Sequence, residues 1–186
     1  VSWATQCTGP AMTGTGEIYF SAYALFLKAS TAQVSFLAAV PSLLGSFAQL
    51  FAAWLARHSG RRKGIILAGV LGQTVTWLLI IWLPYFFPAH AASILIVSVV
   101  LYYATGSLAA PLWNSLMGDL VPEQKRGRFF AQRTRHMSLT SFLSLVLAGG
   151  ALHFADLHAS TRLGFLVIFN IAIVARVYSF YQLSRM

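Results

Sequence analysis

Glu17 is the side chain of this sequence best suited to chemistry, because it is an acid within a long apolar stretch. A charge at the centre of a bilayer costs on the order of 3 kcal/mol, so such residues usually face a cavity or a partner. Burial also favours the uptake of a proton by a carboxylate. Two interpretations follow: a site for a proton or a cationic substrate on a cavity wall, or a neutral carboxyl group hydrogen-bonded between helices.

Arg176 is the one basic residue well inside an apolar stretch. We expect its long side chain either to extend to the nearby membrane surface or to contact an anionic substrate or lipid. Four other polar residues lie within the apolar runs, and most of them are expected to hydrogen-bond to neighbouring helices, at about 0.6 kcal/mol each: Asn114, Gln73, Thr74 and Asn170. Asn114 is also a candidate for contact with a substrate.

Catalytic and metal-binding patterns are weak in this chain. His153, Asp156 and His158 could hold zinc, but their spacing fits no standard zinc pattern. The run from Gly60 to Gly64 lacks the spacing of a phosphate-binding loop. No paired acid and base, or metal constellation, supports an enzyme. We therefore predict no enzymatic activity, no cofactor and no metal site.

Six long apolar runs carry these residues. About 20 residues at roughly 1.5 Å rise each span the hydrocarbon core as a helix. Pro and Gly interrupt several runs, the first most of all, which membrane helices tolerate where neighbouring helices or water satisfy the freed backbone groups. The hydrophilic segment 118–136 is expected to be a cytoplasmic loop, either solvated or carrying a short amphipathic helix against anionic lipids. The predicted spans are residues 3–27, 33–56, 65–87, 91–117, 137–154 and 163–182.

The composition indicates that lipid is the main solvent. Apolar residues make up 58% of the chain and charged residues only 9%, whereas a soluble domain carries about 25% charged residues. The net charge of +9 could suggest nucleic acid as a partner, but the basic residues lie in short loops between apolar runs, where membrane topology explains them. The chain begins with Val1, so we expect a piece of a longer product.

The distribution of Lys and Arg orients the predicted spans. If every span crosses, ten of the 13 lie on one side and two, Lys28 and Arg162, on the other. Because Lys and Arg favour cytoplasmic loops, the count predicts a multi-pass protein of the cell membrane with both termini in the cytoplasm. An odd number of spans would destroy this segregation. The ten are Arg57, Arg61, Arg62, Lys63, Lys125, Arg126, Arg128, Arg133, Arg135 and Arg185.

The connector after the second span, residues 53–63, resembles the loop between helices two and three of major facilitator superfamily (MFS) transporters. That loop reads approximately Gly-x-Leu-Ala-Asp-Arg-x-Gly-Arg-Arg. Residues 118–129, which read Gly-Asp-Leu-Val-Pro-Glu-Gln-Lys-Arg-Gly-Arg-Phe, are similar to the segment after helix four in many bacterial members. The resemblance covers essentially the whole chain. The residues of the connector that match in register are Leu55, Ala56, Gly60, Arg61 and Arg62.

The connector also departs from the MFS loop. Ala53 stands where the family has its glycine, Arg57 where it has its acid, and His58 where it has the following arginine. In the family that acid helps to latch the two halves of the transporter together. Two interpretations of Arg57 are open: a charge swap in which it pairs with Asp119, or an ordinary basic residue of a cytoplasmic loop. The gating motif implied by the resemblance comprises Arg57, Gly60, Arg61, Arg62, Asp119 and Arg126.

The resemblance implies an all-α fold, the N-terminal half of an MFS transporter, with six transmembrane helices in two inverted three-helix repeats. It also implies secondary active transport of a small solute by alternating access, around a site between two halves. The implied partners are the solute, a coupling ion (proton or sodium), the lipid bilayer, and a missing C-terminal half or a second copy. The alternative is a stand-alone small membrane protein, either a scaffold or a homodimeric pore.

Overall fold

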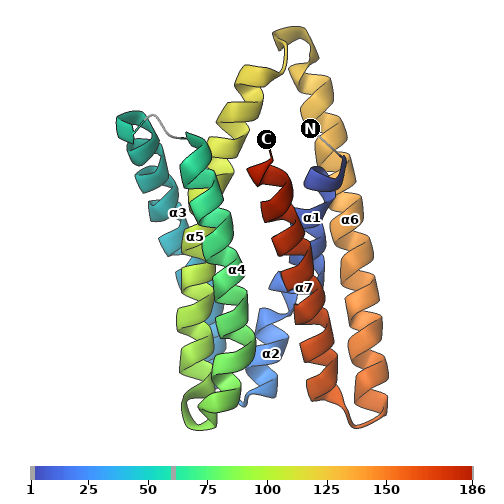
Figure 1. Ribbon diagram of the computed structural model, residues 1–186. Helices are drawn as coiled ribbons and strands as arrows, with labels where there is room; N and C mark the ends of the chain where they lie inside the picture. Colours follow the sequence, from blue (N-terminus) through green and yellow to red (C-terminus); the bar gives the residue numbers. More distant parts are fainter. Residues whose placement is uncertain (1–2, 60–61, 186) are drawn as a thin grey trace. The chain divides into compact units, whose positions relative to one another are not determined.

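The structure, a computed structural model, describes residues 3–59 and 62–185, and these residues form helices and no strands (Figure 1). The all-α prediction is therefore confirmed. The elements are α1 (Trp3–Thr15), the 3₁₀ helix η1 (Glu17–Tyr19), α2 (Phe20–Phe26), α3 (Thr31–Ser59), α4 (Arg62–Phe86), the 3₁₀ helix η2 (Pro88–His90), α5 (Ala91–Leu120), α6 (Glu123–Leu157) and α7 (Thr161–Ser184).

Five of the described helices, α3 to α7, are long and apolar enough to cross a membrane. The first predicted span, 3–27, is instead divided into α1, η1 and α2, so none of its pieces reaches the required length. The division falls at Gly16, whose φ of −131° and ψ of −59° depart from helical values. A sixth crossing, if it exists, is therefore made by a discontinuous helix.

The segment 118–136, predicted to be a loop, is mostly helical. α5 continues to Leu120, and α6 begins at Glu123 after a two-residue turn. The Nε of Arg126 donates a hydrogen bond of 3.0 Å to the Val121 carbonyl oxygen in this turn. At about 1.5 Å per residue, the 35 residues of α6 extend about 52 Å, which exceeds the ~30 Å hydrocarbon core. Glu, Gln, Lys and Arg are good helix formers, so the polar segment extends the helix although it is too hydrophilic to lie in lipid.

The chain divides into two compact units, which are described separately: unit 1 holds the residues up to Tyr23 and from Phe130 onward, and unit 2 holds Ala24–Phe129. In unit 2, α5 packs against both α3 and α4, which contact each other little. The core of unit 2 contains Trp77 of α4 and Tyr102 of α5, whose rings meet edge to face at 5.5 Å. Gly69 lets α4 approach α5 closely, since a Cβ there would lie 2.7 Å from the Thr105 carbonyl oxygen.

In unit 1, α1 packs against α7, and two aromatic side chains of α2 contact those of α7. The Tyr23 ring meets that of Phe169 edge to face at 5.0 Å and that of Phe165 at 5.2 Å. The Phe20 ring lies 6.3 Å from that of Phe169. Tyr23 follows Phe20 in the first segment, whereas its partner Phe165 precedes Phe169 in α7. The first segment therefore runs antiparallel to α7. The α1 segment also contacts α6, where Gly14 lies directly against the Ser141 carbonyl oxygen.

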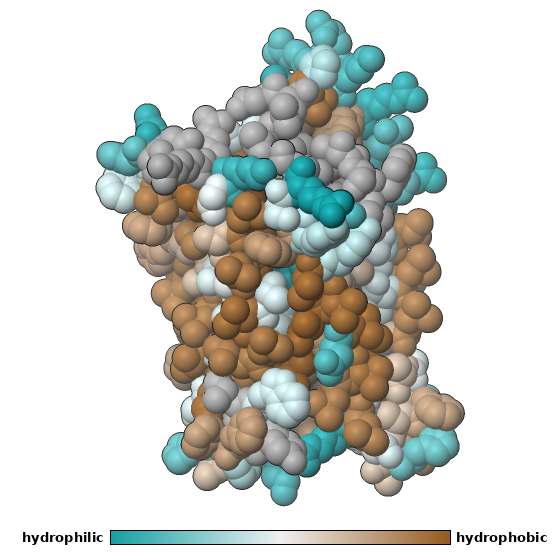
Figure 2. All heavy atoms as spheres, in the orientation of Figure 1, coloured by the Kyte–Doolittle hydropathy of each residue, from teal (hydrophilic) through white to brown (hydrophobic). Residues whose placement is uncertain are grey.

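Large apolar side chains cover the outside of the helices in both units. Leu50, Leu147 and Val174 are 70%, 72% and 68% exposed. Figure 2 shows hydrophobic side chains along the middle of the helices and hydrophilic ones toward their ends. Soluble proteins rarely expose apolar patches of this extent. The apolar surfaces therefore fit contact with lipid, in agreement with the membrane class predicted from composition.

We predict that Gly14→Ala lowers the thermal stability of the purified protein in detergent. The added Cβ would overlap the Ser141 backbone carbonyl, and overpacking of this kind costs about 1–3 kcal/mol. The matched control is Gly150→Ala, because a Cβ at Gly150 meets nothing within 4 Å and alanine gains up to about 1 kcal/mol in helix propensity. Equal melting temperatures for the two variants would contradict the close α1–α6 contact.

Candidate functional site

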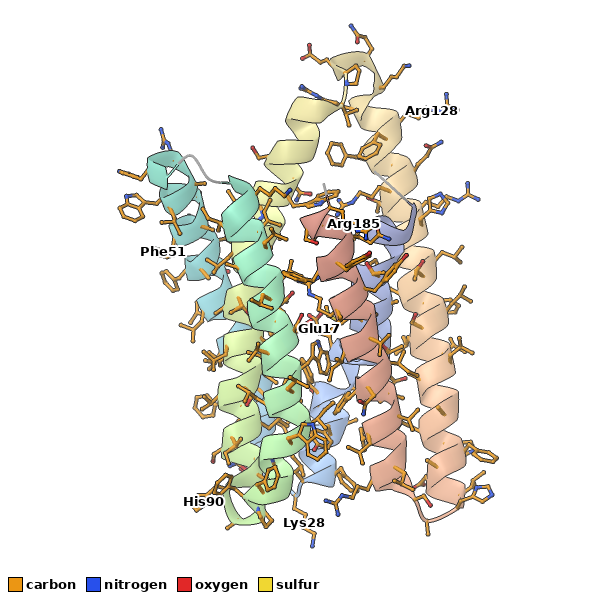
Figure 3. All side chains as sticks on the ribbon, viewed as in Figure 1. Glu17, Lys28, Phe51, His90, Arg128 and Arg185 are labelled. Atoms are coloured by element: carbon orange, nitrogen blue, oxygen red, sulfur yellow. The ribbon has the colours of Figure 1, made fainter. Side chains whose placement is uncertain are left out.

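Glu17 lies at the break between α1 and α2, as the first residue of η1. Its side chain is half-buried, and the Thr13 hydroxyl donates a hydrogen bond of 3.2 Å to its Oε2. Figure 3 shows Glu17 well inside the length of unit 1, away from the end at which Arg185 lies. The acid is therefore held within an apolar segment by a donor from the last turn of the preceding helix, α1.

Backbone hydrogen bonds continue on both sides of the break. The Gly16 N–H donates to the Met12 carbonyl and the Tyr19 N–H donates to the Gly16 carbonyl, both at 2.9 Å. The Tyr19 hydroxyl reaches α6 and donates a hydrogen bond of 2.7 Å to the Leu145 carbonyl oxygen. This bond joins residues far apart in the sequence and fixes the position of η1, and therefore that of Glu17, against α6.

Arg176 is buried in unit 1, with 9% of its surface exposed. It belongs to a set of buried residues that recur at helical spacing along α7. The two aromatic members of that set contact the first segment of the chain, so the set faces α1 and α2. The sequence predicted either extension to the membrane surface or contact with an anion, and the side chain lies in the interior of its unit. The set comprises Phe165, Phe169, Ala172, Arg176 and Ser179.

The other polar candidates have different surroundings. Gln73 is buried, and its Nε2 donates to the Tyr102 carbonyl oxygen at 3.4 Å, which confirms the predicted bond between helices. For Thr74 and Asn170 that prediction is wrong, because both donate to carbonyls one turn earlier in their own helices, those of Val70 and Leu166. Asn114 is exposed on α5 in unit 2. It therefore belongs to a different unit from Glu17 and Arg176.

The residues of the implied gating motif are described in part. Arg57 lies in the last turn of α3 with an exposed side chain, and Arg126 binds the turn between α5 and α6. Gly60 and Arg61 lie outside the described residues. The backbones of Arg62 and Asp119 are described, at the start of α4 and near the end of α5, but their side chains are not.

The histidines near the end of α6 form no metal site in the part of the chain that the structure describes, where no three His, Cys, Asp or Glu side chains gather around one point. Asp156 accepts a hydrogen bond of 2.8 Å from the Thr161 hydroxyl at the start of α7. His158 Nδ1 lies 2.9 Å from the Phe154 carbonyl oxygen. Both residues therefore take part in the turn between α6 and α7.

Two residues beside Glu17 were missed by the sequence analysis. Thr13 precedes Glu17 by one helical turn, a spacing that places their side chains on the same face of a helix. This signal was present in the sequence. The contact of Tyr19 with Leu145 joins positions 126 residues apart, and no local pattern predicts it.

Comparison with known proteins gives one match. A family model described as Major Facilitator Superfamily matches residues 3–184. No curated protein and no solved structure matches the chain. The family predicted from the two basic segments is thus confirmed, by a match that covers nearly the whole sequence.

We predict that Tyr19→Phe destabilises the protein by about 1 kcal/mol, because it removes one hydrogen bond between η1 and α6. For a chain of this size such a loss lowers the melting temperature by roughly 2–4 °C. Tyr181→Phe is the control, since Tyr181 is 46% exposed and a phenylalanine ring keeps its contact with Arg185. If both variants melt at the wild-type temperature, the bond does not hold η1 in place.

Proposed function

The chain belongs to the major facilitator superfamily, and we propose that it is the N-terminal half of a transporter that moves a small solute by alternating access. Members of this family are membrane transporters, and the apolar helices mark a multi-pass membrane protein. The observation that carries the more specific proposal is an acidic residue at a break in the first apolar segment. Transporters commonly build substrate and ion sites from discontinuous helices near the bilayer midplane.

The way the helices are grouped into the two units supports our proposal of two inverted three-helix repeats. If predicted spans one to three form one repeat and spans four to six the other, span one corresponds to span four. In unit 2, span four (α5) packs against spans two and three, α3 and α4. In unit 1, span one packs against spans five and six, α6 and α7. Each unit thus joins the first helix of one repeat to the last two of the other, as a two-fold relation between the repeats would require.

The helix directions support an even number of crossings. In unit 1 the first segment runs antiparallel to α7, so α1 begins at the end of the unit where α7 finishes (Figure 1). Together with the excess of Lys and Arg in the connectors, this arrangement supports our proposal that both termini are cytoplasmic.

We assign Glu17 the role of a coupling or substrate residue. A carboxylate inside a membrane helix is functional by default, and this one lies where the helix is broken. A proton or a sodium ion is the proposed coupling ion. Asn114, exposed on α5 in unit 2, is proposed to contact the substrate, because α5 is the counterpart of the segment that carries Glu17. The site would be completed by a second six-helix half or a second copy.

We further propose that Arg57 and Asp119 form a cytoplasmic gate pair in unit 2. Gly45 of α3 lies against Ser107 of α5, where an added Cβ would lie 2.8 Å from the serine Oγ. Both helices finish at the same end of unit 2 (Figure 1). Arg57 lies 57 − 45 = 12 residues beyond Gly45, and Asp119 lies 119 − 107 = 12 residues beyond Ser107. The parallel register therefore supports placing the two residues at the same level.

We predict that Glu17→Gln abolishes transport while the protein still folds. The complete native polypeptide is reconstituted in liposomes, and uptake of labelled sugars, amino acids, organic acids and amines is compared with that of empty liposomes. At least one solute should be taken up with saturable kinetics, and the variant should lose this uptake because it cannot exchange a proton. Asn170→Asp is a useful control for a change of charge elsewhere in the membrane, since Asn170 is exposed on α7. A flux that never saturates would indicate a pore and contradict the proposal.

The gate pair predicts a charge-exchange rescue. Arg57→Asp should reduce the uptake rate several-fold, because two acids would then face each other. Adding Asp119→Arg should restore most of the rate, with little change in stability, since an exposed pair contributes only about 0–1 kcal/mol. Lys63→Asp, an exposed basic residue near the start of α4, controls for the general loss of positive charge. If the second substitution does not restore uptake, the proposed pairing of Arg57 with Asp119 is wrong.

A further inference from the structure

The buried position of Arg176 raises the question of what compensates its charge. An arginine in the interior of a membrane protein stays protonated and needs an acid or a set of carbonyl groups nearby. Arg176 lies eight residues before the last residue of α7 (184 − 176), which is about 12 Å at 1.5 Å per residue. It also lies on the side of α7 that faces the first segment of the chain.

Unit 1 contains two acidic residues, Glu17 and Asp156. Asp156 lies in the last turn of α6 and accepts a hydrogen bond from Thr161 at the start of α7. Arg176 lies 176 − 161 = 15 residues further along α7, or about 22 Å, which exceeds the reach of its side chain. Within unit 1 this leaves Glu17 as the acid that can neutralise Arg176.

The register of the helices brings Glu17 and Arg176 to the same level. Phe20 contacts Phe169 across the antiparallel pair. Seven residues before Phe20 is Thr13, and seven residues after Phe169 is Arg176. Along α7 seven residues are two turns, or about 10 Å, and the first segment covers the same number of residues through the end of α1, the turn at Gly16 and η1. Thr13 and Arg176 therefore lie at a similar level, and Thr13 holds the Glu17 carboxylate.

The directions of the side chains support the same conclusion. Glu17 and Phe20 are the first residue of a 3₁₀ helix and the residue three positions later, so their side chains lie on the same face. Phe20 faces α7. In a helix, Cα–Cβ bonds tilt toward the N-terminus, so the Arg176 side chain leans from the level of Thr13 toward that of Glu17. The Glu17 carboxylate, bound by Thr13, lies toward Arg176.

We propose that Glu17 and Arg176 form a buried ion pair that joins the broken first helix to α7. Arg176 is then a positioning residue that acts through Glu17. Because the pair carries no net charge, the site offers little attraction to a cationic substrate, and a proton delivered to Glu17 during transport would break the pair. The part concerning protons rests on the proposed transport function, whereas the ion pair itself does not.

Paired neutralisation tests the proposal by thermal unfolding of the complete native polypeptide in detergent. Glu17→Gln should lower the melting temperature by roughly 5–10 °C, because it leaves a buried guanidinium that cannot lose its proton. Arg176→Gln should lower it less, because Glu17 can take up a proton and become neutral. The double variant should regain at least half of the loss caused by Glu17→Gln. Arg176→Lys should retain most of the wild-type stability, since it keeps the charge.

The control for this cycle is Glu17→Gln combined with Arg162→Gln. Arg162 lies in the first turn of α7, at the opposite end from Arg176, so no recovery is expected. Additive losses in the Glu17→Gln and Arg176→Gln double variant would overturn the ion pair. All these measurements are made without a substrate, so they remain decisive if the chain transports nothing.

Cross-linking tests the register without altering either charge. In a Cys7→Ser background, Met12→Cys and Ser179→Cys place thiols on two buried positions of α1 and α7. A short bifunctional thiol reagent should join them, as seen by mass spectrometry of the linked peptides. In the register of Thr13 with Arg176, Met12 lies at the level of position 177, two residues from Ser179. The control pair, Met12→Cys with Ile168→Cys, lies 177 − 168 = 9 residues out of register, or about 14 Å, and should not cross-link. Cross-linking of the control pair alone would overturn the proposal.

Discussion

The absence of water from the bilayer core is the constraint on which the rest of this structure depends. Every backbone polar group in lipid must find its partner inside the protein, and long helices achieve this. Polar side chains follow the same rule. Thr74, Thr105 and Asn170 each donate to a carbonyl one turn earlier in their own helix, whereas Gln73 reaches the neighbouring α5. In both arrangements the donated O–H or N–H group has a carbonyl partner inside the protein.

The break in the first segment is compatible with this constraint because it changes the hydrogen bonding without abolishing it. The N–H groups of Gly16 and Tyr19 both keep carbonyl partners, and the Tyr19 hydroxyl binds a carbonyl of α6. The 3₁₀ turn then aligns Glu17 with Phe20 on one face. Phe20 on that face contacts Phe169 of α7.

Much of this architecture could be predicted from the sequence, because hydropathy follows the thickness of the bilayer. The spans beginning near positions 33, 65, 91 and 163 agree with α3, α4, α5 and α7 to within a few residues. The loop expected at 118–136 was wrong because hydropathy measures preference for lipid, whereas good helix formers such as Lys125 and Arg128 extend α6 in water. Among the residues of the candidate site, Glu17 could be identified from the sequence without knowledge of its neighbours. Its contact with Thr13 is local and could be predicted from the spacing. The burial of Arg176 depends on packing between segments about 150 residues apart, and the spacing of residues within one helix does not predict such packing.

The helices of the two units pack against one another through different kinds of side chain. In unit 2, α5 meets its neighbours through small residues such as Gly45 and Gly69 and through the uncharged side chain of Gln73. In unit 1, the first segment meets α7 through aromatic rings. The first segment carries Glu17, and α7 carries the buried Arg176. If a two-fold axis relates the two proposed repeats, and therefore the two units, that symmetry does not extend to the ionisable groups. A response to protons within the membrane would then originate in unit 1, while the basic connector that resembles the family's gate lies in unit 2.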